Sequence, residues 1–392
     1  MTLPLGFRFA ATYAGIRKTV KEDLVLIVSD PPAAGAAVFT QNRVQAAPVI
    51  VSKKHLKASR GTVRAIVINA GNANCATRTG EKIALSTCRA AARLLKAPVA
   101  QVLPASTGVI GVEMDGGKIE RAMPGLAASL SEGNFGAAAA AIMTTDIVPK
   151  TAMAEIAVGD GTVRIAGMTK GSGMIQPMMA TTLGFLMTDA MIPAPTLRKM
   201  LLRANELSYS RISVDGDTST NDTLILMANG ASGIRLRGSD SDLFELALTK
   251  VAQDLARQIA RDGEGASKLI TITVIGTADD NDAARIARSI ANSPLLKTAV
   301  YGNDPNWGRI LSAAGNSGVA FDPHKVDVWM QGVQVCAAGF AAKFSEDELK
   351  QKLAAKDCLI DLRFRGNGQG QARFWTCDYT EGYISINASY RT

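Results

Sequence analysis

Strand-like and helix-like segments alternate along this chain from one end to the other. Short β-branched and aliphatic runs are typical of strands, and they occur at Leu24–Val28, Ala65–Asn69, Leu269–Ile275 and Cys358–Phe364. Amphipathic stretches have helical spacing, most clearly at Glu81–Lys96, Ala194–Leu207, Asp242–Arg261 and Ala283–Asn292. This mixture predicts an α/β or α+β protein with mixed sheets.

The size of the chain bounds the number of domains. Its 392 residues are enough for two ordinary domains or for one large α/β unit. Hydrophobic residues make up 47% of the sequence and charged residues 20%, which is the profile of a globular protein and not of a disordered one. Aromatic residues are scarce, at 5%, so we expect a core of aliphatic side chains and close backbone contacts.

The charge pattern favours neither nucleic acid nor a membrane as a partner. The net charge of +8 is modest for this length, and no run of Lys and Arg is interleaved with aromatics. We interpret it as a mildly basic surface that attracts anionic substrates. The sequence has no apolar stretch of about 18 residues, and its start, MTLPLGFRFAATYAG, does not read as a secretory signal.

The cysteines indicate the compartment. There are five, at Cys75, Cys88, Cys336, Cys358 and Cys377, and no two form a CxxC pair. An odd number without paired spacing argues against a disulfide framework and against a thiolate metal site. We therefore expect a protein of a reducing compartment, the cytoplasm.

Residues 170–190 contain the strongest candidate for chemistry, and they read KGSGMIQPMMATTLGFLMTDA. A Gly-Ser-Gly stretch and a proline lead into two threonines, and Leu183–Met187 then reads as a buried strand. A hydroxyl residue at the start of a core strand is well placed for nucleophilic work, although the same arrangement is more often a structural turn. A threonine hydroxyl is a weak nucleophile and needs a nearby base.

The two histidines are poor candidates for that base. His55 lies in the lysine-rich stretch SKKHLK, and His324 follows Asp322-Pro323 in a turn. We interpret both as solvated surface histidines, so a Ser/His/Asp triad has little support.

An N-terminal threonine would need no histidine. Cleavage of the preceding peptide bond frees an α-amine, which can act as base for the hydroxyl of its own residue. The unperturbed pKa of an α-amine, about 7.7–8, lies close to neutrality. Gly171 and Gly173 would let the preceding segment adopt the strained turn that self-cleavage requires.

This segment resembles the cleavage motif of the ornithine acetyltransferases, the glutamate N-acetyltransferases of the cyclic arginine pathway. Other blocks resemble the same family, in the same order, across essentially the whole chain. They are GFRFAATYAGIRK near the N-terminus, NAGNANCATRTG at 69–80, PASTGVIG at 104–111, IMTTDIVPK at 142–150, SVDGDTSTNDT at 213–223, DGEGASK at 262–268, GNDPNWGRI at 302–310 and the terminal INASYRT. The length and order of the blocks make this a strong resemblance.

The resemblance implies that the chain cuts itself between Ala180 and Thr181 and that Thr181 is the nucleophile. Residues 1–180 would become an α chain and residues 181–392 a β chain. Two such pairs usually assemble as an α2β2 heterotetramer. The implied fold is the mixed α/β sandwich of the ornithine acetyltransferases, which is similar to DmpA-like N-terminal-nucleophile proteins.

The resemblance also implies the residues of the active site. Thr107 and Gly108 correspond to the oxyanion hole, in which a hydroxyl and a glycine N–H stabilise the tetrahedral intermediate of acyl transfer. The substrate-binding residues are then Lys170, Thr181, Glu264, Asn387 and Thr392. Among these, Lys170 suits a carboxylate and Glu264 suits an amine or another cation.

One position departs from the family pattern. The family usually has Thr-Thr-Asp-Thr where this chain reads Thr-Thr-Asp-Ile, at 144–147, and position 147 belongs to the substrate pocket by that pattern. Ile147 lacks the side-chain hydroxyl. This departure bears on substrate preference or affinity and not on the nucleophile or the oxyanion hole.

Metal and nucleotide sites have little support in the sequence. The aspartates of VDGDTSTND, Asp215, Asp217 and Asp222, lack the terminal glutamate of an EF-hand, so we interpret them as a turn with self-satisfying side-chain hydrogen bonds. Neither GxxxxGK[ST] nor a GxGxxG opening a helix is present. We expect no metal and no redox cofactor.

The function that the resemblance implies is transfer of acetyl from N-acetylornithine to glutamate, through an acetyl-threonine enzyme. Two questions stay open: acetyl-CoA as a second donor, which would make the enzyme bifunctional, and the effect of Ile147 on the preferred amino acid. Two other functions also remain. One is an N-terminal-nucleophile aminopeptidase or amidase, which would pass its acyl group to water. The other is an unprocessed scaffold without enzymatic activity.

Overall fold

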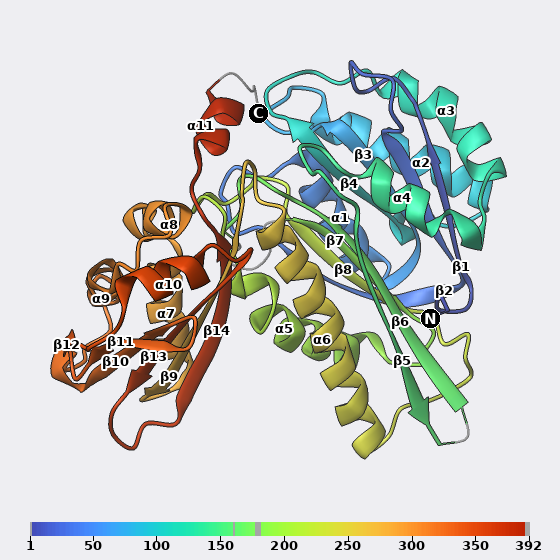
Figure 1. Cartoon of the computed structure of the whole chain (residues 1–392). Coiled ribbons are helices and arrows are strands. Elements are labelled where there is room, and N and C mark those ends of the chain that lie inside the picture. The colour runs from blue at the N-terminus through green and yellow to red at the C-terminus, as the bar shows by residue number, and fades with distance from the viewer. Residues whose placement is uncertain (1, 160, 177–181, 389–392) are drawn as a thin grey trace.

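The computed structural model describes residues 2–159, 161–176 and 182–388, and its two parts are each built on one sheet (Figure 1). The first sheet has eight strands. These are β1 (Phe7–Thr12), β2 (Leu24–Phe39), β3 (Thr62–Asn72), β4 (Val102–Val109), β5 (Lys150–Val158), β6 (Gly161–Lys170), β7 (Leu183–Thr188) and β8 (Thr223–Ala228). Their order is β4-β3-β2-β8-β7-β6-β5, and β1 pairs with β2 off this path.

Strand β2 belongs to both halves of this sheet. Its first half, Leu24–Val28, pairs with β3, and its second half, Ala34–Phe39, pairs with β8. The register shifts between the two halves, and buried residues from both share one hydrophobic cluster, among them Ile27, Ile66, Phe185 and Ile225. The two halves therefore pack against each other, which brings the ends of distant strands together.

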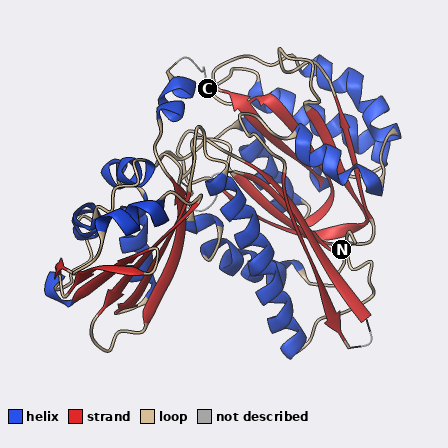
Figure 2. Cartoon of the chain, in the orientation of Figure 1, coloured by secondary structure: helices blue, strands red, loops and turns tan. Residues whose placement is uncertain are grey.

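Helices cover the outer faces of the first sheet (Figure 2). They are α1 (Ala47–Ala58), α2 (Gly80–Leu95), α3 (Gly116–Ala128), α5 (Ala194–Glu206) and α6 (Ser239–Arg261). Helix α4 (Phe135–Ala141) instead packs its buried residues into the cluster that the two halves share. Helices α1, α2 and α3 share a cluster with β2, β3 and β4, while α5 and α6 share one with β6, β7 and β8. Alternate residues of each strand face different clusters, as period-two burial requires.

The second part is built on a six-stranded sheet of order β12-β11-β10-β13-β9-β14. Its strands are β9 (Leu269–Thr277), β10 (Val326–Met330), β11 (Val333–Ala337), β12 (Phe340–Ala341), β13 (Asp357–Phe364) and β14 (Gly370–Cys377). One cluster joins β9, β10, β11, β13 and β14 to α7 (Asp280–Ala291), α8 (Pro294–Tyr301), α9 (Trp307–Gly315) and α10 (Glu346–Leu353), while both residues of β12 are exposed. The short helix α11 (Glu381–Asn387) follows β14 and lies above the junction of the two parts (Figure 1).

The predicted mixture of helices and strands is confirmed, and all eight predicted segments fall on an observed element. The boundaries differ most at β2, which continues to Phe39, and at β3, which spans Thr62–Asn72. The five cysteines are free, as expected, and all of them are buried. Among the described residues no helix combines the length and apolarity needed to cross a membrane.

The prediction for His55 is wrong, because this side chain is buried. It lies on the inward face of α1 with Val51 and Ser52, at helical spacings of four and three, and its Nδ1 is 2.7 Å from the carbonyl oxygen of Val102. The charged neighbours in SKKHLK occupy the outer face and hide this pattern. His324 is exposed, as predicted.

Candidate active site

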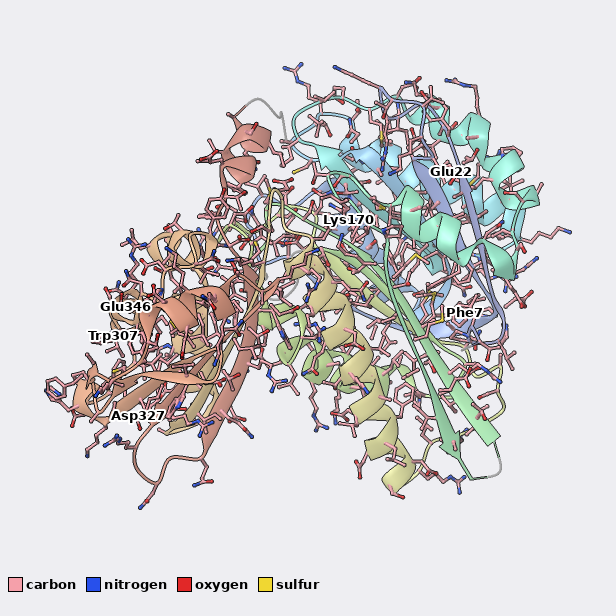
Figure 3. The ribbon with its side chains drawn as sticks, in the orientation of Figure 1. Phe7, Glu22, Lys170, Trp307, Asp327 and Glu346 are labelled. Atoms are coloured by element: carbon pink, nitrogen blue, oxygen red, sulfur yellow. The ribbon has the colours of Figure 1, made fainter. Side chains whose placement is uncertain are left out.

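A cavity of about 210 Å³ lies where the ends of several elements meet. Its lining includes Thr107 and Gly108 at the end of β4, Lys170 at the end of β6, Glu264 in the loop after α6, and Asn387 in α11. Figure 3 labels Lys170 near the centre of the molecule, close to the junction of its two parts. The cavity therefore gathers residues that lie far apart in the sequence.

The end of β4 requires glycine at position 108. Gly108 has φ +130°, and an added Cβ would lie 2.3 Å from the backbone carbon of Gly71 and 2.5 Å from the backbone nitrogen of Asn72. These contacts arise because β3 and β4 pair in parallel through an irregular register at this point. Asn221 braces the same strand end, since its Nδ2 donates to the carbonyl of Ser106 over 2.8 Å. Gly108 and its neighbour Thr107 are therefore fixed against the cavity.

Lys170 is buried and points its ammonium at two groups. The Nζ lies 3.4 Å from the Thr107 Oγ1 and 4.0 Å from an oxygen of Asp146. Burial lowers the pKa of Lys170, and the nearby carboxylates of Asp146 and Glu264 oppose that effect only in part. A cation that lines a cavity and is short of water is suited to bind a substrate carboxylate.

A carboxylate without solvent exposure, Asp146, lies behind Lys170. It accepts hydrogen bonds from the Nζ of Lys150 over 2.7 Å, from the N–H of Gly171 over 2.6 Å and from the N–H of Thr144 over 3.0 Å. Burial by itself would raise the pKa of Asp146, but the charges of Lys170 and Lys150 and these hydrogen bonds together hold it well below its usual value. Asp146 is thus an ionised group inside the protein.

Glu264 also lines the cavity. It is buried, its N–H donates to the carbonyl of Ser172 over 2.9 Å, and its carboxylate accepts from the Nδ2 of Asn387 over 2.9 Å. Gly173 leaves room for this carboxylate, because a Cβ there would lie 2.3 Å from the Glu264 Oε2. A carboxylate and an amide placed together can accept and orient an amine.

The aspartate turn does more than satisfy itself, which corrects the interpretation of this segment. Asp215 does accept one local bond, from the N–H of Asp217 over 3.3 Å. Its shorter bonds come from the N–H groups of Met174 and Ile175, over 2.6 and 2.7 Å. Asp215 therefore anchors the segment that leads toward the predicted cleavage site, and the sequence could not show this because the partners are about 40 residues away.

The structure brings together five of the predicted site residues in one cavity: Thr107, Gly108, Lys170, Glu264 and Asn387. The positions Ala180, Thr181 and Thr392 lie outside the described residues. Ile147 does not line this cavity; its side chain is 76% exposed and its N–H donates to Asp262 over 3.0 Å. The roles assigned to all these residues stay predictions.

The sequence prediction missed several residues that also line the cavity. They are Ile110, Thr144, Thr145, Gly173, Met174, Asp215, Asp217, Ser219, Asn221 and Tyr383. Most lie within the blocks that resemble the family, so block membership was a signal, but it did not distinguish cavity residues from their neighbours. Thr182, next to the predicted nucleophile, is buried with its Oγ1 3.3 Å from the Thr169 Oγ1.

Comparison with known proteins shows which family the sequence fits. The family model described as the ArgJ family matches residues 8–392. The chain belongs to the ArgJ family. The ArgJ match spans both sheets and every described residue of the cavity, so the predicted membership of the ornithine acetyltransferase family is confirmed.

Two ArgJ proteins resemble the chain over essentially its full length, and an ArgJ crystal structure resembles about half of it. The arginine biosynthesis bifunctional protein ArgJ of Thermus thermophilus is 48% identical over 395 residues, covering 100% of this chain and 99% of its own. That of Nitratidesulfovibrio vulgaris is 44% identical over 394 residues, covering 99% of each. A crystal structure of ArgJ from Bacillus halodurans, 40% identical, covers 53% of this chain and 98% of its own, with a TM-score of 0.51.

Proposed function

We propose that the chain cuts itself between Ala180 and Thr181 and then uses Thr181 to carry acetyl from N-acetylornithine to glutamate. As an ArgJ protein it is an acyltransferase of arginine biosynthesis. The observation that supports the proposed roles most is the cavity itself. It unites Thr107, Gly108 and Lys170 from residues 1–180 with Glu264 and Asn387 from residues 181–392.

In the first half-reaction the Thr181 hydroxyl attacks the acetyl carbonyl of N-acetylornithine. Its proton passes to the α-amine of the same residue, because an N-terminal amine is a base near neutrality. Thr107 and Gly108 stabilise the oxyanion. The C–N bond of the amide then breaks, the α-amine returns the proton to the departing ornithine nitrogen, and an acetyl ester of Thr181 remains.

In the second half-reaction glutamate occupies the place that ornithine left. Its amine attacks the ester carbonyl, the same oxyanion hole stabilises the second tetrahedral intermediate, and N-acetylglutamate leaves. The proton lost by the attacking amine passes through the α-amine to the Thr181 oxygen, which restores the free hydroxyl. Acetyl is neither oxidised nor reduced, so the reaction requires no redox cofactor.

Recognition of both amino acids follows from the charges around the cavity. Lys170 binds a carboxylate, and Glu264 with Asn387 binds an ammonium group; the 2.9 Å bond between the last two supports a shared role. Thr392 completes this set at the chain end. Ile147 lacks the hydroxyl of the family pattern and alters the preference among amino acids from outside the cavity lining.

The proposal extends to assembly and donor choice. Chains 1–180 and 181–392 remain together and pair as an α2β2 heterotetramer in the cytoplasm. The names of the relatives describe bifunctional proteins. We therefore include acetyl-CoA as a second acetyl donor to glutamate at the same threonine.

Intact-mass measurement on purified protein tests the proposal first. We expect two fragments that separate between Ala180 and Thr181, and acetyl transfer that requires glutamate. Thr181→Ala should stay uncut and inactive, while Thr182→Ala is the matched control that keeps the nucleophile. Release of free acetate whether or not glutamate is present would point to the amidase instead. An uncut, inactive parent protein would overturn the proposal.

A further inference from the structure

Two buried lysines and two aspartates form one network beside the cavity. Lys150 donates to Asp146 over 2.7 Å, to Asp262 over 2.5 Å and to the carbonyl of Val148 over 3.3 Å. An ammonium group has three N–H donors, so the hydrogen-bonding capacity of Lys150 is used inside the protein. Lys170, the other lysine of the network, lines the cavity.

Asp146 is the centre of this network and fixes the end of β6. Its Oδ1 accepts from Lys150 and from the backbone N–H of Gly171, the residue directly after Lys170, while its Oδ2 lies 4.0 Å from the Lys170 Nζ. A buried carboxylate is stable only with such compensation. Asp146 therefore controls both the backbone beside Lys170 and the charge next to its ammonium.

The contact between Lys170 and Thr107 determines which way the hydroxyl proton points. An ammonium can only donate, so in the 3.4 Å contact the Thr107 Oγ1 must accept. The proton of Thr107 is then free to donate elsewhere, and an oxyanion hole needs such a donor. The distance is long, as is common for hydrogen bonds that tighten only when substrate binds.

We propose that Asp146 is a positioning residue for acyl transfer: it holds Lys170 so that the ammonium donates to the Thr107 hydroxyl and leaves the hydroxyl proton for the oxyanion. This inference rests on the proposed function, because it takes Thr107 as part of the oxyanion hole. It gives Lys170 a second role besides binding carboxylate. It also gives a role to a residue that does not line the cavity.

The charges around Lys170 set the expected pH response. Burial and the charge of Lys150 lower the pKa of Lys170, whereas Asp146, Glu264 and Asp222 raise it. Loss of the Asp146 charge lowers this pKa further. Because the ammonium form is the active one, activity disappears as the pH rises through the pKa of Lys170. The basic limb of the pH profile should then move to lower pH in Asp146→Asn.

The test compares the pH profile of kcat in parent protein and Asp146→Asn, with the processed fraction established by intact mass. We expect kcat to fall by about 10- to 100-fold, less than the roughly 10²–10³ that loss of an oxyanion donor costs, and the basic limb to shift to lower pH. Asp262→Asn is the matched control, because it removes a carboxylate from the far side of Lys150 and should leave the limb in place.

A double-mutant cycle separates positioning from general destabilisation. If Asp146 acts through Lys170, Asp146→Asn should cost little further activity in a Lys170→Met background. If the parent is active, two results would overturn this inference and leave the proposed function intact. One is that the activity losses of Asp146→Asn and Lys170→Met are additive, and the other is that the basic limb does not move in Asp146→Asn. A parent protein that neither cuts itself nor transfers acetyl would overturn the proposed function and the inference with it.

Two further readouts cover an Asp146→Asn protein that folds or matures poorly. Self-cleavage passes through a tetrahedral oxyanion as well, so its rate against pH in the precursor should show the same shift. Asp146→Glu keeps the charge but moves the carboxylate by one methylene. We expect it to retain the basic limb and lose kcat, and an unchanged kcat would contradict the positioning role.

Discussion

The two parts of the molecule each bury a lysine, and the two lysines have different partners. Lys170, at the end of β6, faces the cavity with a hydroxyl at 3.4 Å and a carboxylate at 4.0 Å. Lys297, in α8, is 2% exposed; it donates to the carbonyl of Val214 and to the hydroxyl of Thr376, and its ammonium lies 4.4 Å from the centre of the Tyr379 ring.

Burial lowers the pKa of both lysines, so a lowered pKa does not by itself mark a functional one. The difference lies in the direction that each ammonium faces. Lys297 is enclosed by a carbonyl, a hydroxyl, the sulfur of Cys377 and an aromatic face. Lys170 has a donor available to a ligand. We infer that Lys297 stabilises the junction of the two parts, whereas Lys170 acts on substrate.

The largest effect should come from removing the cavity lysine. Lys170→Met is expected to lower kcat/KM by about 10²–10³-fold, as loss of an oxyanion-hole donor does, with little change in the midpoint of unfolding. Asp146 keeps Lys150 as its counter-ion in this variant. Steady-state kinetics measures kcat/KM, and thermal unfolding of the same preparation measures the midpoint. A stability loss matching the activity loss would make Lys170 a structural lysine like Lys297.

Removing the enclosed lysine should produce the opposite balance. Lys297→Met leaves the buried carbonyl of Val214 without its donor, which costs about 1–3 kcal/mol of unfolding free energy. Val214 precedes Asp215, which lines the cavity, so the variant should also lose some activity. Because Lys297 itself does not line the cavity, we expect a smaller loss of kcat/KM than for Lys170→Met. Urea unfolding measures the first quantity and acetyl transfer the second. If Lys297→Met kept normal stability and lost activity, the two lysines would not differ in the way we infer.

The pH dependence of stability sharpens the same comparison. Burial lowers the pKa of Lys297 below the ordinary lysine value of about 10.4. Between the lowered and the ordinary pKa the unfolded chain binds more protons than the folded protein, so the stability contributed at Lys297 rises with pH there. Lys297→Met should therefore show a flatter curve of unfolding free energy at alkaline pH. Parallel curves for the parent and the variant would contradict this.

The smallest effect is expected on the surface of the second part. A hydrogen bond from the Arg365 guanidinium holds the pKa of Asp327 below its usual value (Figure 3 labels Asp327). The stability from this pair is present above the ordinary pKa of aspartate and is lost as the pH falls through the lowered pKa. Asp327→Asn should lower Tm slightly at neutral pH, less so in acid, with kcat unchanged. A changed kcat would mean that this surface communicates with the cavity.

Much of the fold followed from sequence patterns because those patterns record burial. Segments such as Leu183–Met187 and Cys358–Phe364 lie on strands whose inward residues are apolar, so period and residue type were sufficient. His55 was predicted wrongly because the local pattern around it does not record its burial. Its charged neighbours obscured an inward face that only the packing of α1 against β4 reveals.

The sequence predicted the site residues that belong to a recognisable motif, and it did not predict those whose role depends on a tertiary contact. Thr107, Gly108, Lys170, Glu264 and Asn387 lie in blocks that resemble the family, and the structure brings them to one cavity. Asp215 and Asp146 are different, because their importance lies in partners elsewhere in the chain. The sequence does not show whether a loop carboxylate accepts its hydrogen bonds from water or from a buried N–H group.

The sequence by itself determined the mixed α/β class, the family and five of the residues that line the cavity, because local periodicity and motif order are properties of the chain. The tertiary structure decided which charged residues face one another. Two lysines with equal intrinsic chemistry became different because Lys170 was placed beside Asp146 and an open cavity, and Lys297 against hydrogen-bond acceptors and a ring. The energy of a buried charge depends on its surroundings, and only the packed fold supplies these.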